Sequence, residues 1–528
     1  MYRLLSLYLN LFMILMPIKK DISSFGFLSL TLLICGVSVV TGMLFTITGI
    51  WNDNTFVTAA STTEKDMLPD ILDEGIEATV VVEGLERPTS MAFLGPNDFI
   101  VLEKKSGIVK RIVNGNILEP PLLDVKVANE KERGLLGVAI SKMVTQTVGN
   151  SQSDNKEPSN PHSTRVFLYY TESSGEDGID DCPTINYCAE GTEPKGNRLY
   201  RYDLEQDRLV NPKLLLDLPA NPGADHLGGS LIIGPDSNLY LTTGDGHSCS
   251  YNSCDEGFEE TVLNSQSANV DDGHVPDGRG GILRVTQDGE QVTEGNKRWV
   301  LGDVGILDKY YAYGIRNSYG IDFDYLSGKL WDTENGPSFG DEINLVEPGF
   351  NSGWLKIQGI WPIYNHTLLY PQGLTPPYRG YFESGDSKFI NSSKVDLEDL
   401  VDFQGRGKYS DPEFIWNMTV GLTALKFFDS DKLGEEYKDD LFVADSNHGN
   451  LYHFDLSVDR TTLEFGNRIT DRIVHSLDKE ELGSILFGHG FDSITDLEVG
   501  PDGYLYVVSH KQGKIFKIVP DDVKESPT

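Results

Sequence analysis

The stretch VGPDGYLYVVSHKQGKIFKI, Val499–Ile518, decides the fold. Its apolar runs are short, rich in β-branched and aromatic residues, and separated by a Gly-Pro turn and a Gly turn, as in consecutive β-strands. The same order of strands and turns occurs in FLGPNDFIVLEKKSGIVKRI, Phe93–Ile112, and in IGPDSNLYLTTG, Ile233–Gly244, which leads to Gly281–Val285. Looser copies occur around Val138–Tyr202, Gly320–Val346 and Leu422–Phe454.

These copies amount to about six modules between residues 78 and 520. A single small antiparallel sheet cannot bury both of its faces alone, so such modules close into a ring. The chain's 54 Gly and 25 Pro suit a turn-rich β protein with few helices. The sequence therefore predicts an all-β fold, a six-bladed β-propeller over residues 76–520, with a short tail at 521–528.

The N-terminal part predicts a transmembrane helix. No charged residue occurs from Ile22 to Asn52, and about 20 apolar residues suffice to cross a bilayer. Lys19 and Lys20 precede the apolar run, so the positive-inside rule places residues 1–24 in the cytoplasm. We expect an anchor at 25–51, a polar tether at 52–75, and a propeller outside the cell. A cleaved signal peptide is the alternative.

The charge balance excludes one class of partner. The chain has 44 Lys and Arg against 80 Asp and Glu, a formal net charge of −36. Such an acidic surface repels phosphate groups, so nucleic-acid binding is not expected.

The cysteines agree with an exterior location. Four of the five follow the apolar segment, an even number that predicts two disulfides in an oxidising compartment. The candidates are Cys182, Cys188, Cys249 and Cys254. Local pairing, Cys182 with Cys188 and Cys249 with Cys254, is one of three connectivities, and a zinc site is the alternative.

Three polar clusters are candidates for chemistry. They are Glu132–Gly137 (ERGLLG), Asp225–Gly229 (DHLGG) and Gly314–Gly320 (GIRNSYG), the last continuing through LWDTENGPSFGDEIN at 330–344 to NSGW at 351–354. A His beside a carboxylate is typical of a general base near neutral pH. An Arg can hold an anionic cofactor or stabilise developing negative charge. Structural roles are the alternative, with His226 bonding a loop and Arg316 pairing with Asp341 or Glu342 between blades.

In these clusters the sequence resembles the glucose/sorbosone dehydrogenases, soluble aldose sugar dehydrogenases that depend on pyrroloquinoline quinone (PQQ). The resemblance extends over roughly residues 78–520. It rests on the strings Glu-Arg-Gly-Leu-Leu-Gly, Asp-His-x-Gly-Gly, Gly-x-Arg-Asn and Glu-x-Gly-Pro-x-x-Gly-Asp-Glu-x-Asn, in this order.

The resemblance implies a six-bladed propeller with PQQ over its central axis, a role for each cluster, and calcium beside the cofactor. By analogy, His226 takes the proton of the sugar hydroxyl while hydride passes to the quinone. Asp225 and Glu132 would lie near the substrate, and the catalytic Arg316 would contact the cofactor together with Asn317. The main-chain carbonyls of Gly336 and Pro337 would bind the calcium, which prefers hard oxygen ligands.

The sequence departs from the family where cations bind the PQQ carboxylates. Asn447 stands at the family's Lys position, and Ser493 and Thr495 stand at two Arg positions. His448 is a partial substitute by position. Charge-assisted bonds are the strong ones, so three missing cations weaken the cofactor prediction more than the fold prediction.

The leading hypothesis is a membrane-anchored, exterior-facing dehydrogenase that oxidises an aldose with PQQ and calcium, and passes electrons to an acceptor that the sequence does not name. A non-catalytic extracellular binding propeller that has lost the PQQ clamp is the alternative. A calcium-dependent lactonase-like hydrolase is a third, supported by fold analogy alone.

Overall fold

The computed structural model describes residues 68–142, 164–174, 194–221, 223–246, 265–293, 301–303, 305–337, 339–360, 397–475 and 477–521. The predicted cytoplasmic segment and anchor, most of the tether, and the four disulfide candidates lie outside these residues. Within the described part of the chain, no helix is long and apolar enough to cross a membrane.

Hydrogen bonding divides the strands among six sheets. The first contains β3 (Pro88–Gly95), β4 (Asp98–Glu103), β5 (Ile108–Val113), β6 (Asn116–Ile117) and β7 (Leu123–Asp124). The second contains β8 (Leu135–Lys142), β9 (Thr164–Ser173), β10 (Pro194–Glu205) and β11 (Arg208–Leu218). The third contains β12 (Leu231–Ile233), β13 (Leu239–Thr243), β14 (Gly281–Val285), β15 (Tyr310–Tyr313), β19 (Phe350–Asn351) and β20 (Lys408–Tyr409).

The remaining three sheets follow in chain order. The fourth contains β16 (Ser318–Phe323), β17 (Leu330–Glu334), β18 (Asp341–Val346), β21 (Phe414–Trp416) and β26 (Ile473–Val474). The fifth contains β22 (Leu422–Phe427), β23 (Leu441–Asp445), β24 (Leu451–Leu456), β25 (Leu463–Glu464), β27 (Leu486–His489) and β1 (Asp70–Ile71). The sixth contains β28 (Ile494–Val499), β29 (Leu505–Ser509), β30 (Lys514–Pro520) and β2 (Ile76–Glu83).

Helices are few and short in the described residues. Three are 3-10 helices, at Gln266–Ala268, Gly305–Lys309 and Leu397–Asp399, and α3 is the five-residue helix Lys479–Gly483. The all-β, propeller-like arrangement predicted from the sequence is confirmed.

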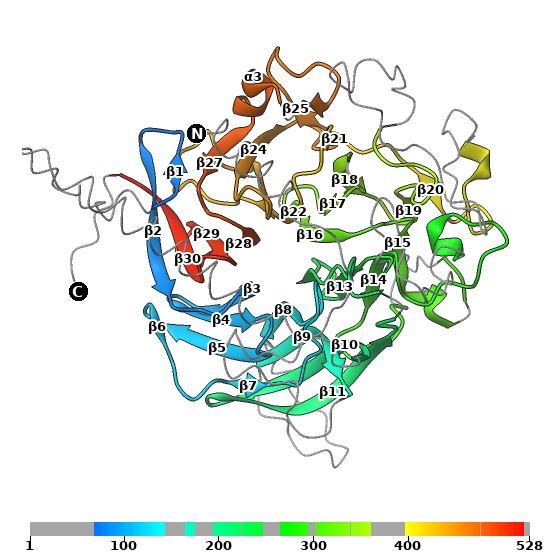
Figure 1. Ribbon diagram of the computed structural model, residues 1–528, viewed down its shortest axis with the longest axis horizontal. Helices are drawn as coiled ribbons and strands as arrows, with labels where there is room; N and C mark the ends of the chain where they lie inside the picture. The colour runs from blue at the N-terminus through cyan, green and yellow to red at the C-terminus, as the bar shows by residue number, and fades with distance from the viewer. Residues whose placement is uncertain are drawn as a thin grey trace, which may run out of the picture. The chain divides into compact units, whose positions relative to one another are not determined.

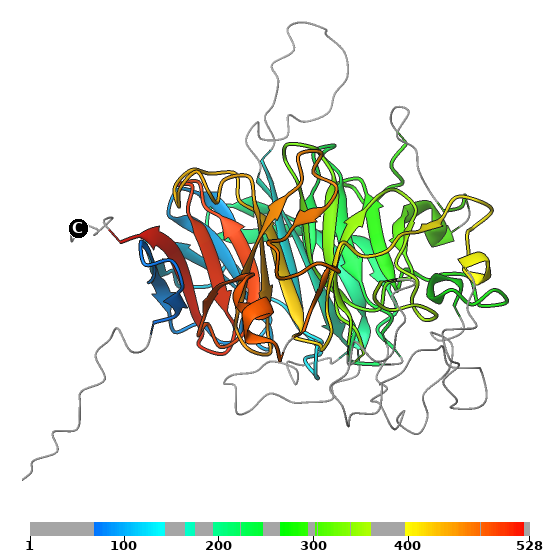
Figure 2. The same ribbon diagram turned by 90° about the horizontal axis from the view of Figure 1, so that it is seen from above.

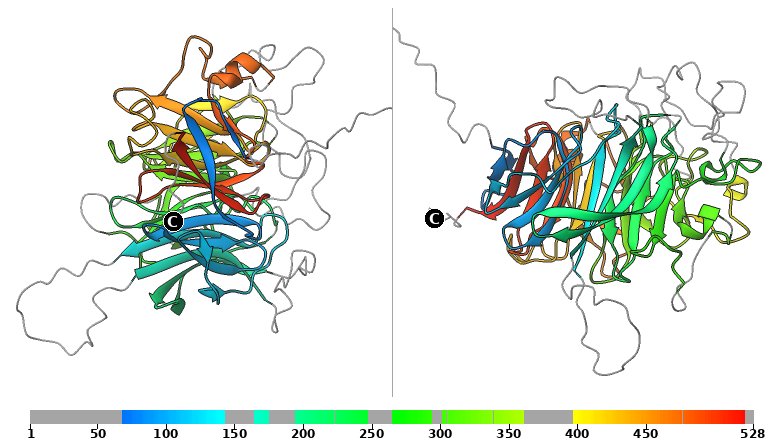
Figure 3. Two further views of the ribbon diagram at one scale, coloured as in Figure 1. Left: turned by 90° about the vertical axis from the view of Figure 1, so that its left-hand side faces the viewer. Right: turned by 90° about the horizontal axis from the view of Figure 1, so that it is seen from below.

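The six sheets stand around a common axis (Figure 1). One edge strand of each sheet lies innermost: β3, β8, β12, β16, β22 and β28 each contact the next, and β28 returns to β3. Strand β2 joins the last sheet by antiparallel pairing with β30, in which Ala78 faces Ile518. The left panel of Figure 3 shows blue β2 beside red β30, so the two ends of the folded region meet in one sheet.

The Gly-Pro turns of the repeat form alike. In the hairpin β28–β29 the amide of Gly500 donates to the carbonyl of Tyr504, and Asp502 accepts the Tyr506 hydroxyl at 2.9 Å. In β12–β13 the Gly234 amide bonds the Asn238 carbonyl, and Asp236 accepts the Tyr240 hydroxyl at 3.1 Å. The shared sequence therefore encodes one local turn, in which Asp bonds the backbone and a Tyr of the following strand.

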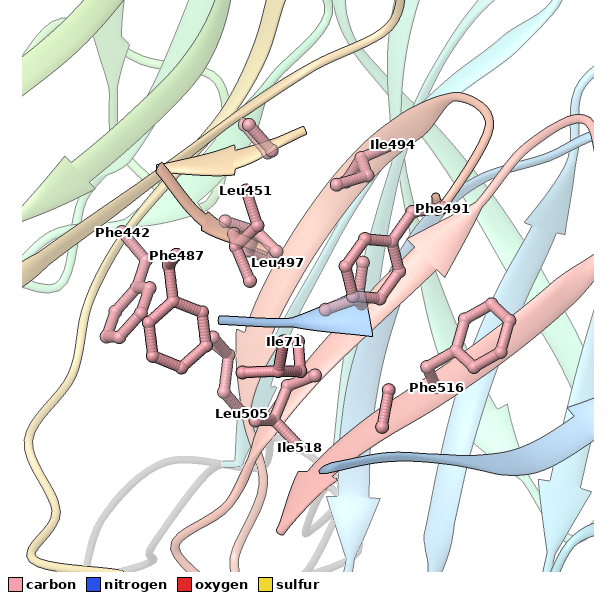
Figure 4. Packing of buried hydrophobic residues seen from close by; sticks show 14 of the residues in the cluster. Ile71, Phe442, Leu451, Phe487, Phe491, Ile494, Leu497, Leu505, Phe516 and Ile518 are labelled. Carbon is pink, nitrogen blue, oxygen red and sulfur yellow. The ribbon is translucent and has the colours of Figure 1, made fainter. Parts of the chain in front are cut away.

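The hydrophobic core lies between neighbouring sheets, which Figure 2 shows edge-on. Central strands such as β13, β23 and β29 are buried at every position, because a sheet packs on each of their faces. Figure 4 shows Phe442 and Phe487 of the fifth sheet packing toward Leu497 and Leu505 of the sixth. Ile71 of β1 belongs to the same buried cluster, so the end of the segment predicted to be a tether is part of the folded unit, which begins at Leu68.

Candidate active site

A cavity of about 460 Å³ opens where the loops that precede the innermost strands converge. All three polar clusters of the sequence reach it. The predicted site residues that line it are Glu132, His226, Arg316, Asn317, Gly336 and Asn447, and the neutral Ser493 and Thr495 line it as well. The ring therefore brings together residues that lie more than 300 positions apart in the chain.

His226 is buried and held through both ring nitrogens. Its Nδ1 lies 2.7 Å from Oδ1 of Asp245, and its Nε2 lies 2.8 Å from Nη2 of Arg316. A guanidinium can only donate hydrogen bonds, so Nε2 must accept and the proton of the neutral imidazole must lie on Nδ1. This tautomer, assigned from the hydrogen bonds, places the basic lone pair of Nε2 in the bond with Arg316 at the cavity wall.

The carboxylate that orients His226 is Asp245, which follows β13 and is 2% exposed. Its second oxygen accepts Nε1–H of Trp354 at 2.8 Å, so both carboxylate oxygens are fixed. Asp225, the sequence neighbour of His226, instead forms an ion pair with Lys131 at 2.9 Å and is not among the described residues that line the cavity.

Arg316 joins the base to the turn between β17 and β18. Its Nη1 donates to the carbonyls of Asn335 at 2.7 Å and Gly336 at 3.1 Å, and its guanidinium lies 5.5 Å from the Trp354 ring centroid. Burial lowers the pKa of Arg316, and surrounding carboxylates oppose this shift. No ion pair joins it to Asp341 or Glu342 among the described residues, so the predicted clamp between blades is not formed by these side chains.

Glu132 joins the loops that carry His226 and Arg316. It accepts hydrogen bonds from the Leu227 amide at 3.2 Å, from Nδ2 of Asn317 at 3.4 Å, and from the Tyr319 hydroxyl. Asn317 in turn accepts the Gly228 amide at 3.2 Å, so one polar network crosses from the second sheet to the third and fourth. Asn317 therefore positions the loop that carries His226.

The turn predicted to bind calcium is shaped by Asp341. This carboxylate accepts the amides of Gly336 at 2.8 Å, Val420 at 2.8 Å and Gly421 at 2.7 Å. Burial raises the pKa of Asp341 to about 6 despite these bonds. The Gly336 carbonyl faces Arg316, whereas Pro337 is exposed and is not among the described lining residues.

A buried acidic group lies behind Arg316. Glu334 accepts the Arg316 amide at 2.6 Å and the Ser352 hydroxyl at 2.6 Å, and it pairs across the sheet with Glu342. Burial raises the pKa of Glu334 well above its usual value, and the neighbouring carboxylates add to this. Asp332, on the same strand, has no hydrogen-bond partner among the described residues, and burial raises its pKa to about 7.

The cavity wall formed by the fifth and sixth sheets is uncharged at the three departures from the family. Asn447, Ser493 and Thr495 all line it, while His448 is exposed and is not among the described lining residues. Besides Arg316, the lining includes three Lys residues, Lys104, Lys131 and Lys426. Lys426 lies 2.9 Å from Glu498 and 3.6 Å from Asp322, so its charge is internally neutralised.

Three side chains of the site were not predicted from the sequence. Asp245 lies in the string TTGDG directly after a strand. A carboxylate at the end of a strand, on the rim of a propeller, could have marked it as a candidate site residue. Trp354 and Glu334 lie inside the third cluster, but their contacts with Asp245 and Arg316 could not be read from spacing.

Comparison with known proteins decides the family. The profile of the glucose / sorbosone dehydrogenase family matches residues 85–365, more than half of the chain. The chain belongs to this family. The resemblance seen in the sequence is thus confirmed.

Curated relatives and solved structures agree with the assignment. Aldose sugar dehydrogenase YliI of Escherichia coli is 23% identical over 448 residues, which cover 84% of this chain and 93% of the relative. Quinoprotein glucose dehydrogenase B of Acinetobacter calcoaceticus is 34% identical over 165 residues, 31% of this chain and 32% of the relative. A putative glucose dehydrogenase of Thermus thermophilus superimposes with a TM-score of 0.53 at 24% identity, covering 84% of this chain and 100% of that structure.

The apo form of the soluble aldose sugar dehydrogenase of Escherichia coli gives a TM-score of 0.52 at 20% identity. It covers 84% of this chain and 99% of that structure. At these identities the superpositions establish the fold alone.

Proposed function

We propose that the protein is a quinone-dependent dehydrogenase that oxidises a hydroxyl of an aldose. The observation that carries the proposal is the hydrogen-bonded series Asp245–His226–Arg316 in the wall of the cavity. It offers a base with a fixed tautomer beside a fixed cation, as removal of a hydroxyl proton requires. Membership of the family and relatives named as aldose sugar dehydrogenase and quinoprotein support the same reaction class.

The residues present fit the reacting end of PQQ with calcium. Gly336 lines the cavity, and its carbonyl oxygen has a second lone pair besides the one that Arg316 uses. Bound PQQ would supply the acceptor for the hydride, and Gly336 and Pro337 would offer carbonyl oxygens to calcium, a hard cation. Asn317 and Asn447 would offer amide groups to the cofactor.

The chain's own contribution is proton transfer. The substrate hydroxyl gives its proton to Nε2 of His226 while a hydride leaves the carbon that bears this hydroxyl. A carbonyl product remains. Asp245 stabilises the imidazolium that forms, as a carboxylate on Nδ1 does in other His-based sites. Arg316 must release Nε2 for this step, and its remaining bonds to Asn335 and Gly336 keep it beside the base.

Reconstitution tests the proposal. Apo protein is mixed with PQQ and calcium and assayed with a dye acceptor on a panel of aldoses. We expect turnover that needs PQQ and is lost in His226→Ala. Absence of turnover in the wild type, together with no PQQ binding, would overturn it.

The neutral Asn447, Ser493 and Thr495 favour a second function, a binding propeller for glycan or protein without catalysis. Under that function His226→Ala leaves ligand capture and biological activity intact.

We also interpret the six sheets as the six blades of the propeller, and propose that residues 25–51 anchor it outside the cell. Protease protection in intact cells checks the orientation.

A further inference from the structure

Positive charge gathers near one edge of the cavity, although the chain as a whole carries −36; of the three residues concerned, Lys104 lines the cavity, and Arg87 and Lys511 are not among the described lining residues. We call Arg87, Lys104 and Lys511 the cationic edge. It lies where the first and sixth sheets meet. There the Lys104 amide donates to the Arg87 carbonyl at 3.2 Å, and His510 and Thr495 both bond the Pro88 carbonyl.

Lys104 lines the cavity, and no hydrogen bond or ion pair joins its ammonium group to a carboxylate of the described residues. Its Nζ donates to the main-chain carbonyls of Lys131 at 2.5 Å and Arg133 at 2.8 Å. Burial lowers the pKa of Lys104 to about 8, and Glu132 and Asp225 act on it only at longer range. An ammonium group has three protons, so one donor remains for a ligand.

Arg87 and Lys511 add positive charge that carboxylates of the described residues neutralise only in part. No hydrogen bond or ion pair joins the Arg87 side chain to any described residue. Lys511 is 45% exposed and lies 3.6 Å from Asp492. Burial lowers the pKa of the neighbouring His510 to about 4, and the charges of Lys104, Arg87 and Lys511 contribute to this shift.

The cationic edge lies beside Thr495, one of the three neutral residues at the family's cation positions. We propose that Lys104 and Arg87, assisted by Lys511 at the rim, bind a carboxylate group of the ligand and replace the cations missing at Asn447, Ser493 and Thr495. Charge-assisted bonds from Lys and Arg to carboxylates provide the recognition. The inference rests on the proposed function where the carboxylate belongs to PQQ, whereas an acidic sugar such as a uronic acid would supply the same group from the substrate.

Equilibrium titration of the apo protein tests the proposal without turnover. The probes are PQQ in the presence of calcium, followed by fluorescence quenching, and glucuronate, followed by calorimetry. The variants are Lys104→Met and Arg87→Met, and Lys213→Met is the matched control, since Lys213 pairs with Asp288 far along the outermost strand β11. Arg87→Met removes no hydrogen bond or ion pair within the described residues, so it tests the proposal even if Lys104→Met unfolds.

We expect each test variant to bind PQQ about ten- to a hundredfold more weakly, the size of one lost charge-assisted bond, and the control to bind normally. Weaker glucuronate binding with unchanged PQQ binding also supports the proposal and assigns the carboxylate to the substrate. Unchanged binding of both probes overturns the proposal and leaves the proposed function standing. A wild-type protein that binds neither probe overturns both.

Discussion

Asp245→Asn is the substitution that probes the proposed base most sharply. In the wild type, Oδ1 accepts Nδ1–H of His226 at 2.7 Å and Oδ2 accepts Nε1–H of Trp354 at 2.8 Å. An Asn has one oxygen and one NH₂ group, so it cannot accept both protons. Either the NH₂ group faces the indole N–H, or it faces Nδ1 and forces the imidazole proton onto Nε2.

The second arrangement places Nε2–H against Nη2 of Arg316, two donors face to face, and removes the lone pair that takes the substrate proton. The first arrangement leaves a buried indole N–H without an acceptor and replaces the negative charge that stabilises the imidazolium. Loss of a general base lowers rates about 10²- to 10⁴-fold, which corresponds to roughly 3–5 kcal/mol in the activation free energy.

The assay is dye-linked aldose oxidation with PQQ and calcium, with kcat and KM measured from pH 5 to 9. We expect kcat to fall at least a hundredfold with little change in KM. Trp354→Phe is the control, because it removes the donor to Oδ2 and keeps the bond to His226, and its kcat should fall less than tenfold. An Asp245→Asn enzyme within threefold of wild type, with the same pH profile, would refute the assignment of the base.

Three further predictions follow from other contacts. Asp332→Asn should stabilise the metal-free protein by up to about 4 kcal/mol at pH 8 but by only about 1.5 kcal/mol at pH 5, as measured by urea unfolding. The folded state holds the Asp332 proton up to about pH 7, whereas the unfolded state loses it near pH 4. The free energy of unfolding of the wild type therefore falls between pH 4 and pH 7. A variant whose stability depends on pH as strongly as that of the wild type would contradict the reasoning. Glu132→Gln should raise KM for aldoses about tenfold, because Tyr319 and the His226 loop lose their charged acceptor; an unchanged KM argues against a role in the substrate wall. Arg316→Lys keeps the charge but loses the planar donors that join His226 to the Gly336 carbonyl, so kcat/KM should fall about ten- to a hundredfold, and equal activity would show that charge alone suffices.

The fold could be predicted from the sequence because its repeat is local. The Gly-Pro-Asp string sets a turn through bonds within a few residues, as Asp236 and Asp502 show, and the apolar runs beside it can only be strands. The pairing of Ile71 with the fifth sheet was not predictable, because a two-residue strand in a polar stretch has no periodicity to detect.

The site could be predicted as a set of loops but not as a set of bonds. Asp225 was the natural partner for His226 by adjacency, yet His226 adopts a left-handed conformation with φ of 58° that turns its ring away toward the end of β13. Asp245 lies there because β12 and β13 pair antiparallel within the third sheet, which brings the loop before β12 beside the end of β13. The position of Lys104 was not predictable either, because its ammonium group is held by the Lys131 and Arg133 carbonyls in the loop before β8 of the second sheet.

The most direct test of the account is the rate at which bound quinone is reduced when an aldose is added to the reconstituted protein in a stopped-flow instrument. We expect rapid reduction in the wild type and reduction at least a hundredfold slower in His226→Gln, with both proteins binding PQQ equally. Equal reduction rates in the two proteins, or a wild type that binds PQQ and never reduces it with any aldose, would contradict the central claim.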